Sequence, residues 1–376
     1  MPGPDITRLK NKAAGYFTFL RCAIWAGALV AAFTQTVTGH AREPWQVQSE
    51  AGHSAASQPS PSAQTAPAKE AQSAAAASTQ PQTSQQQNTE DNGTFVIRKD
   101  VDEVVLHATV ADDRQRIVTD LDKSAFTVLE DGKPQAIISF HHEDIPVAIG
   151  ILIDNSGSMR EKRAKVNQAA LNLVRSSNPQ DEVFVVNFND EYYLDQDFTN
   201  DLLKLKEALE KIDAKGGTAL YEAVVASADH LKRDARLERR VLFVVTDGED
   251  NASRESLEQA VKQLQEENGP SVYAIGILGD EEHPKRARHA LEIIAQRTGG
   301  LAFFPKTLDE VDEISRQVAH DIRNQYTIGY KPTNPRSSGG FRQIRVEAKA
   351  KGHGKMMVRT KSGYYAGTQR AAAGAK

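Results

Sequence analysis

Short apolar runs alternate with helix-like patterns through residues 146–324, and this alternation limits the possible folds more than any other feature of the sequence. The strand candidates lie at 147–153, 183–188, 192–197, 241–246, 272–277 and 301–304, and most of them are apolar runs; the helical patterns lie at 160–176, 200–213, 219–233, 254–267, 284–298 and 307–323. Such alternation predicts an α/β fold, with a doubly wound, mostly parallel sheet covered by helices on both faces. Only the short turn Asn189-Asp190 precedes residues 191–198, so we expect that segment to pair antiparallel as an edge strand.

The first apolar run ends in small residues that carry oxygen atoms. Val147–Ile153 is typical of a strand buried on both faces. Asp154, Ser156 and Ser158 follow at alternating positions, and the glycine between the serines allows a tight turn. One carboxylate and two hydroxyls that converge there would form an oxygen-only cluster suited to Mg²⁺ or Mn²⁺. The alternative for this stretch alone is an ordinary loop and helix cap, because Ser and Asp favour both.

Two later segments place further oxygen ligands on loops. Thr218 follows two glycines and precedes a helical pattern, and Asp247 ends the apolar run 241–246. Loops at the carboxyl ends of neighbouring parallel strands converge on one crevice, so these residues can meet Asp154 and the two serines around one ion. The alternative makes Thr218 a helix cap and Asp247-Gly248 a simple turn.

The whole constellation resembles the von Willebrand factor type A domain and its metal-ion-dependent adhesion site. All five motif positions are matched: DNSGS supplies Asp154, Ser156 and Ser158, GGT supplies Thr218, and TDG supplies Asp247. The resemblance covers roughly half of the chain. It implies a divalent cation, Mg²⁺ or Mn²⁺, held directly by the hydroxyls and partly through water by the carboxylates. One coordination position would remain for an Asp or Glu carboxylate of a protein partner.

That site would make the protein a metal-dependent, adhesion-type binding module and not an enzyme. Two carboxylates approximately neutralise the charge of a divalent ion, so we do not expect a large net charge at the site. We expect the partner carboxylate to be attracted instead to the positions of water molecules that the ion polarises. A helix beginning near residue 160 would add positive potential from its N-terminal amides. Two alternatives stay open: an enzyme that uses the ion as a Lewis acid, and a structural envelope protein whose metal only stabilises it.

The N-terminal region has the character of an export signal followed by a spacer. Residues 1–41 carry basic residues and then an apolar run of twelve, Cys22–Phe33, which fits a signal peptide better than a membrane span. An uncleaved signal-anchor, and hence a membrane tether, remains the alternative. Residues 42–93 are rich in Ala, Ser, Gln, Pro and Thr and predict a disordered linker. An exported protein, periplasmic, cell-surface or secreted, is therefore expected, and its flanks resemble secreted von Willebrand-A-related proteins of acidobacteria.

Strand patterns flank the central domain on both sides. Residues 94–145 predict a small β-module with an Asp131-Gly132 turn that favours a hairpin. Residues 325–366 predict a C-terminal β-hairpin, and residues 367–376 a disordered tail. Eleven basic residues and one acid follow position 330. Their alternation with apolar residues indicates a solvated strand face with a loose tail, so no nucleic acid is expected as a partner. Binding of a nucleic acid or another anionic polymer is the alternative interpretation.

The other chemistry that we searched for is missing from the sequence. The net charge of −4 is small and gives no global field for nucleic acid or an acidic substrate. There is no H-E-x-x-H, no G-x-S-x-G and no G-x-x-x-x-G-K-[ST] sequence, which argues against those protease, hydrolase and nucleotide sites. The single cysteine, Cys22, cannot form an internal disulfide. Asp250, and more weakly Asp190, are expected at the rim of the metal site.

Overall fold

The computed structural model describes residues 103–210, 214–279 and 283–367. The predicted signal segment, the linker and residues 368–376 of the predicted C-terminal tail lie outside these residues. Within the described residues, no helix is both long enough and apolar enough to cross a membrane.

A six-stranded sheet forms the centre of an α/β domain. Its strands are β4 (Ala148–Asp154), β5 (Glu182–Phe188), β6 (Tyr192–Thr199), β7 (Arg240–Thr246), β8 (Ser271–Gly276) and β9 (Ala302–Phe303). They follow the order β6-β5-β4-β7-β8-β9. All neighbours pair in parallel except β6, which pairs antiparallel with β5 at the edge. The mostly parallel sheet with one reversed edge strand is therefore confirmed.

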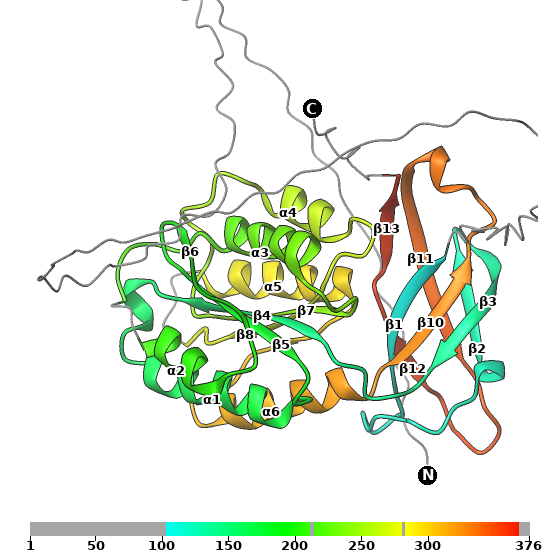
Figure 1. The fold of residues 1–376 in the computed structure, drawn as a ribbon, viewed down its shortest axis with the longest axis horizontal. Helices are drawn as coiled ribbons and strands as arrows, with labels where there is room; N and C mark the ends of the chain where they lie inside the picture. The colour runs from blue at the N-terminus through cyan, green and yellow to red at the C-terminus, as the bar shows by residue number, and fades with distance from the viewer. Residues whose placement is uncertain (1–102, 211–213, 280–282, 368–376) are drawn as a thin grey trace, which may run out of the picture. The chain divides into compact units, whose positions relative to one another are not determined.

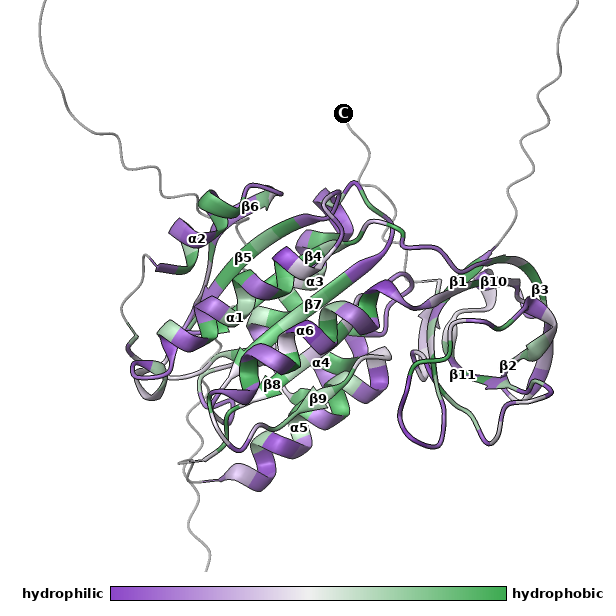
Figure 2. Ribbon diagram, turned by 90° about the horizontal axis from the view of Figure 1, so that it is seen from below, coloured by the Kyte–Doolittle hydropathy of each residue, from purple (hydrophilic) through white to green (hydrophobic). Residues whose placement is uncertain are grey.

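Six helices cover the two faces of this sheet. They are α1 (Arg163–Ser176), α2 (Leu202–Glu210), α3 (Leu220–Asp234), α4 (Leu257–Leu264), α5 (Pro284–Thr298) and α6 (Glu310–Arg323). Helices α1, α2 and α6 lie on one face, and α3, α4 and α5 lie on the other (Figure 1). Every residue of β4 is buried, and the strands are accordingly the most hydrophobic part of the domain (Figure 2). Burial on both faces explains why β4 lacks the polar alternation of a surface strand.

Helix α1 begins later than the sequence predicts. The pattern predicts a helix from residue 160, whereas residues Gly157–Met159 form a separate 3₁₀ turn and the α-helix begins at Arg163. The turn folds the two serines back over the end of β4 before the helix can start. Lys162 thereby becomes the cap residue of α1.

The remaining strands form a β-module of seven strands. They are β1 (Val104–Ala111), β2 (Phe126–Glu130), β3 (Lys133–His141), β10 (Tyr326–Lys331), β11 (Gly340–Ala348), β12 (Met357–Arg359) and β13 (Gly363–Ala366). Strands β2 and β3 form the expected hairpin, with positive φ angles at Asp131 and Gly132, as a tight two-residue turn requires.

The prediction of a separate C-terminal hairpin is wrong. Strand β10 lies between β1 and β3, and β11 lies between β2 and β13, in the order β12-β1-β10-β3-β2-β11-β13. Strands from both ends of the described chain thus share one sheet and one apolar core. The physical reason is burial: neither the 94–145 segment nor the 325–366 segment has enough apolar surface to form a core alone, and interleaving them covers both.

The α/β domain is therefore inserted between two paired strands of the β-module. Strand β3 ends at His141 and β10 begins at Tyr326, and His141 lies opposite Thr327 in the ladder. The two pieces also share side-chain contacts, because Arg359 of β12 donates to both carboxylate oxygens of Asp321 on α6.

Candidate metal site

Two adjacent strands bring the predicted carboxylates to one place. Strands β4 and β7 are parallel neighbours with Ile153 opposite Val245, so Asp154 and Asp247 leave the same edge of the sheet side by side. Both side chains are fully buried. The carboxyl ends of a doubly wound sheet are where such folds bind ligands.

A continuous chain of hydrogen bonds joins four of the five predicted residues. The backbone N–H of Ser156 donates to Oδ1 of Asp154 over 2.8 Å. The hydroxyls of Ser156 and Ser158 are 3.2 Å apart, and that of Ser158 donates to Oδ1 of Asp247 over 2.9 Å. Residues 89 positions apart in the chain are thereby in direct contact.

The loop that carries Thr218 is fixed to this cluster through its backbone. The Gly157 N–H donates to the Gly216 carbonyl over 3.2 Å, and the Lys215 N–H donates to the Asn155 carbonyl over 2.9 Å. Thr218 itself is 3% exposed. Gly216 has a φ of +80°, and a Cβ there would lie 2.2 Å from Oδ2 of Asp190, so only glycine fits this approach of the two loops.

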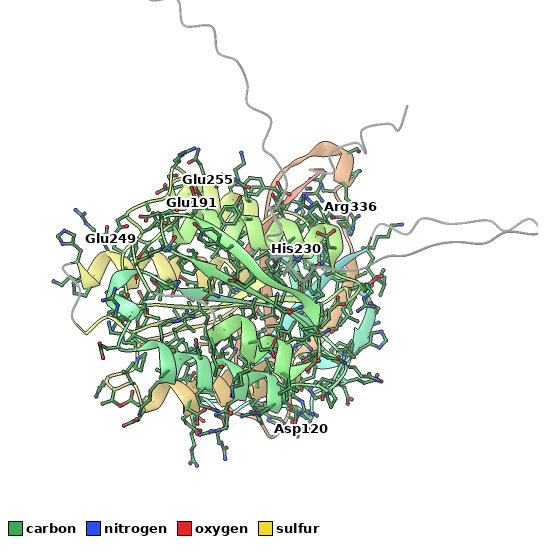
Figure 3. All side chains as sticks on the ribbon, turned by 60° about the vertical axis from the view of Figure 1, so that its left-hand side comes forward. Asp120, Glu191, His230, Glu249, Glu255 and Arg336 are labelled. Atoms are coloured by element: carbon green, nitrogen blue, oxygen red, sulfur yellow. The ribbon has the colours of Figure 1, made fainter. Side chains whose placement is uncertain are left out.

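The rim candidates serve to order the loops. Oδ1 of Asp190 accepts the Gly217 N–H over 2.8 Å. Oδ2 of Asp250 accepts the Tyr221 N–H over 2.8 Å, at the start of α3. Glu191 and Glu249, labelled in Figure 3, are further acids on the same loops. Asp190 and Asp250 thus hold the backbone around Thr218 in place.

Burial strongly affects the ionisation of Asp154. Removal of this carboxyl from water raises its pKa to about 6, against the opposing effect of hydrogen bonds from Thr246 and Ser156. The Arg163 guanidinium lies close by, donating to Asn187 over 2.9 Å, and burial lowers its pKa to about 10. The buried Asp154 carboxyl therefore carries an electrostatic cost that its hydrogen bonds offset only in part.

The spacing of the oxygens fits a small divalent cation. Mg²⁺ binds oxygens at about 2.1 Å in octahedral geometry, which places adjacent ligands about 3 Å apart. The separation of 3.2 Å between the hydroxyls of Ser156 and Ser158, both expected as direct ligands, is close to that value. In the described part of the chain, no three His, Cys, Asp or Glu side chains converge as a metal site would need, so the candidate depends on hydroxyls together with two carboxylates.

Sequence reasoning missed two residues that contact the cluster. The Thr246 hydroxyl donates to Oδ2 of Asp154 over 2.5 Å, and the Lys162 ammonium group donates to Oδ2 of Asp247. Thr246 could have been found from its place beside Asp247 at the end of β7. Lys162 carries only a weak signal, a cation at a helix N-terminus, where the helix dipole disfavours it.

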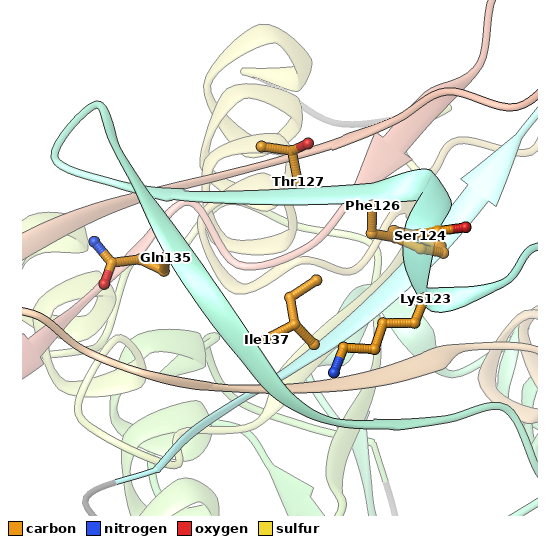
Figure 4. A pocket seen from close by; sticks show the side chains of 6 residues that line it. All are labelled: Lys123, Ser124, Phe126, Thr127, Gln135 and Ile137. Atoms are coloured by element: carbon orange, nitrogen blue, oxygen red, sulfur yellow. The ribbon is translucent and has the colours of Figure 1, made fainter.

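A hollow on the β-module gathers no comparable set of groups. It has a volume of about 520 Å³ and is lined by Lys123, Ser124, Phe126, Thr127, Gln135 and Ile137 (Figure 4). Gln135 is engaged with Thr333 through both its amide nitrogen and its carbonyl oxygen. With no carboxylate in its lining, this hollow is a poor candidate for a cation site.

Several solved structures are similar to this chain. A von Willebrand factor type A protein from Catenulispora acidiphila is 14% identical, with a TM-score of 0.42 and coverage of 71% of this chain and 75% of that one. The PilB minor pilin from Streptococcus sanguinis is 13% identical, with a TM-score of 0.41 and coverage of 48% and 62%. Proximal thread matrix protein 1 from the mussel byssus, with a zinc-occupied MIDAS motif, is 17% identical, with a TM-score of 0.41 and coverage of 52% and 50%. This chain thus spans only about half to two thirds of the pilin and byssus proteins.

None of the curated proteins compared with this chain matches it. A family model does match, over residues 149–249, and it describes the von Willebrand factor type A domain. These residues run from β4 to the loop after β7 and include all five predicted ligands. The protein therefore contains a von Willebrand factor type A domain.

Proposed function

We propose that the protein is a metal-dependent binding module that captures an acidic residue of a protein partner. The observation that carries the proposal is the cluster of hydroxyl and carboxylate oxygens at the ends of β4 and β7. Ser156, Ser158 and Thr218 would hold a divalent cation, Mg²⁺ or Mn²⁺, and Asp154 and Asp247 would support it through water. The ion would supply a positive coordination point for the carboxylate of a partner Asp or Glu.

The exposure of Ser158 supports a site that faces a partner. Ser158 is exposed, whereas Ser156 next to it in space is 3% exposed. An ion held between these hydroxyls would have protein on one side and solvent on the other. A carboxylate arriving from solvent would then meet a partly dry site, in which charge-assisted contacts are strong.

Binding fits the cluster better than catalysis does. A hydrolase that used the ion as a Lewis acid would also need a general base in hydrogen-bond reach of substrate. Both carboxylates already accept hydrogen bonds, Asp154 from Thr246 and Ser156, and Asp247 from Ser158 and Lys162. Neither carboxylate is therefore well placed to act as the general base of a hydrolase.

Location outside the cytoplasm is part of the proposal and depends on the sequence of residues 1–93. A cleaved signal and a polar spacer would place the binding domain at a distance from the membrane or wall. The mass of the mature N-terminus, measured on protein from the native envelope, distinguishes cleavage from retention as an anchor.

The test of the metal site is a calorimetric titration of Mg²⁺ and Mn²⁺ into the wild-type chain, Ser156→Ala and Asp154→Asn. We expect each substitution to lower ion affinity by at least about tenfold, as loss of a ligand or its support does, with little change in melting temperature without metal. The matched control is Ser124→Ala, an exposed serine of the β-module, which should bind as the wild type does.

The wild type and Ser156→Ala also distinguish a metal that mediates partner binding from a metal that only stabilises the fold. Partner capture from the native envelope should require Mg²⁺ and fail with Ser156→Ala. If chelation lowers the melting temperature but leaves the captured proteins unchanged, the metal is structural and the binding proposal is wrong.

A further inference from the structure

Lys162 places a protein cation inside the candidate metal site. Its Nζ donates to Oδ2 of Asp247 over 2.5 Å, and the two side chains are 14% and 0% exposed. The other oxygen of Asp247 accepts the Ser158 hydroxyl. One oxygen of this carboxylate is therefore bound to an expected metal ligand, and the other is bound to an ammonium group.

The position of Lys162 is not explained by the stability of its helix. Lys162 is the cap residue of α1, and its side chain caps no backbone group of that helix. The first turn holds no acidic residue, so no helical neighbour compensates a cation that the helix dipole disfavours. Lysine side chains usually extend their charged end into water, whereas this one turns inward to a buried carboxylate.

We propose that Lys162 is an internal counter-cation that competes with the divalent ion and weakens its binding to the free domain. This inference rests on the proposed metal site. The bound ion could either displace the Lys162 ammonium group from Asp247 or leave it in place, and in both arrangements Lys162 lowers the affinity for the ion. If the ammonium leaves Asp247, a charged hydrogen bond is lost; if it stays, it repels the ion.

The consequence for the partner is an attraction that the five motif residues alone would not produce. Asp154 and Asp247 carry two negative charges when ionised, and Lys162 returns one positive charge at contact distance. A divalent ion then leaves these groups with an excess positive charge, to which the Arg163 guanidinium beside Asp154 adds. A partner carboxylate removes this excess, so ion and partner bind cooperatively.

The test is calorimetric titration of Mg²⁺ and Mn²⁺ into the full chain carrying Lys162→Met. We expect both ions to bind about tenfold tighter than in the wild type, because one nearby charge is removed. Lys162→Gln should also bind them tighter, since it keeps a donor but loses the charge. The matched control is Lys204→Met, which removes an exposed lysine from α2 and should change affinity by less than about twofold.

The outcomes separate this inference from the proposed function. Unchanged or weaker ion binding in both Lys162 variants, beside a wild type that loses affinity on Ser156→Ala, overturns the role of Lys162 and leaves the metal site standing. Absence of ion binding in the wild type overturns both. Tighter binding in the Met and Gln variants of Lys162, with Lys204→Met unchanged, supports the inference.

Discussion

Removing Arg342 from its buried ion pair with Glu130 should strongly destabilise the β-module, and Arg342→Met tests this. The two side chains are 2% and 1% exposed, and they are 3.2 Å apart. Tyr330 and Tyr364 also donate their hydroxyls to Glu130, over 2.5 and 3.1 Å. The four residues come from β2, β10, β11 and β13, so the network joins strands from both ends of the described chain.

The structure allows an estimate of the magnitude. Removing one partner of a buried pair leaves an uncompensated charge, at a cost of about 3–5 kcal/mol. Arg342 also donates to the carbonyls of Asn334 and Pro335 over 2.6 Å each, and both bonds would be lost with it. Because Glu130 keeps its two tyrosine donors, we expect a loss of about 4 kcal/mol in the free energy of unfolding, near the middle of that range.

The assay is equilibrium urea unfolding of the full chain, followed by circular dichroism. Arg345→Met is the matched control, because this arginine lies on the same strand but its side chain is 74% exposed, and it pairs with Glu347 at the surface. An exposed pair contributes at most about 1 kcal/mol. If Arg342→Met and Arg345→Met unfold within about 1 kcal/mol of each other, the reasoning about the buried network is refuted.

Two further predictions concern Gly216, in the loop of Thr218, and the half-buried Lys361. Gly216→Ala should lower Mg²⁺ affinity about tenfold, because a Cβ at φ +80° meets Asp190 and displaces the loop of Thr218. The control is Gly339→Ala, which is also at positive φ but away from the site. It should leave the Mg²⁺ affinity measured by titration unchanged. Burial lowers the pKa of Lys361 from 10.5 to about 8, so its charge destabilises the fold below pH 8 and this cost disappears as pH rises towards 10.5. Lys361→Met should therefore be about 1–2 kcal/mol more stable at pH 7, allowing for partial exposure, and urea unfolding that shows the same pH dependence as the wild type from pH 8 to 10.5 would contradict this.

The sequence predicts the α/β domain well because its signals are local. The central strands β4, β7 and β8 are largely apolar runs, and Gly157 and Gly248 follow shortly after the ends of β4 and β7. The reversed edge strand follows from the short Asn189-Asp190 turn alone. The convergence of Asp154 and Asp247 also follows locally, because Asp154 ends one buried strand and Asp247 comes directly after its neighbour.

What the sequence does not predict depends on long-range pairing or side-chain direction. The pattern of β10 marks a strand but not its neighbours, and only burial of the shared core places it between β1 and β3. Lys162 has the same local sequence signal as any exposed lysine, and its contact with Asp247 depends on a residue 85 positions away. The β-strand pattern near Arg342 likewise gives no indication that this arginine is buried.

The insertion of the α/β domain between β3 and β10 has a consequence for how the β-module can assemble. In the unfolded chain, pairing His141 with Thr327 would require closing a loop formed by residues 142–326, with a substantial entropic penalty. Folding of the inserted domain fixes the two ends of that loop beside each other and removes most of this penalty. The von Willebrand factor type A domain therefore lowers the entropic cost of its neighbour's assembly, and the β-module gains cooperativity from a domain that contributes none of its strands.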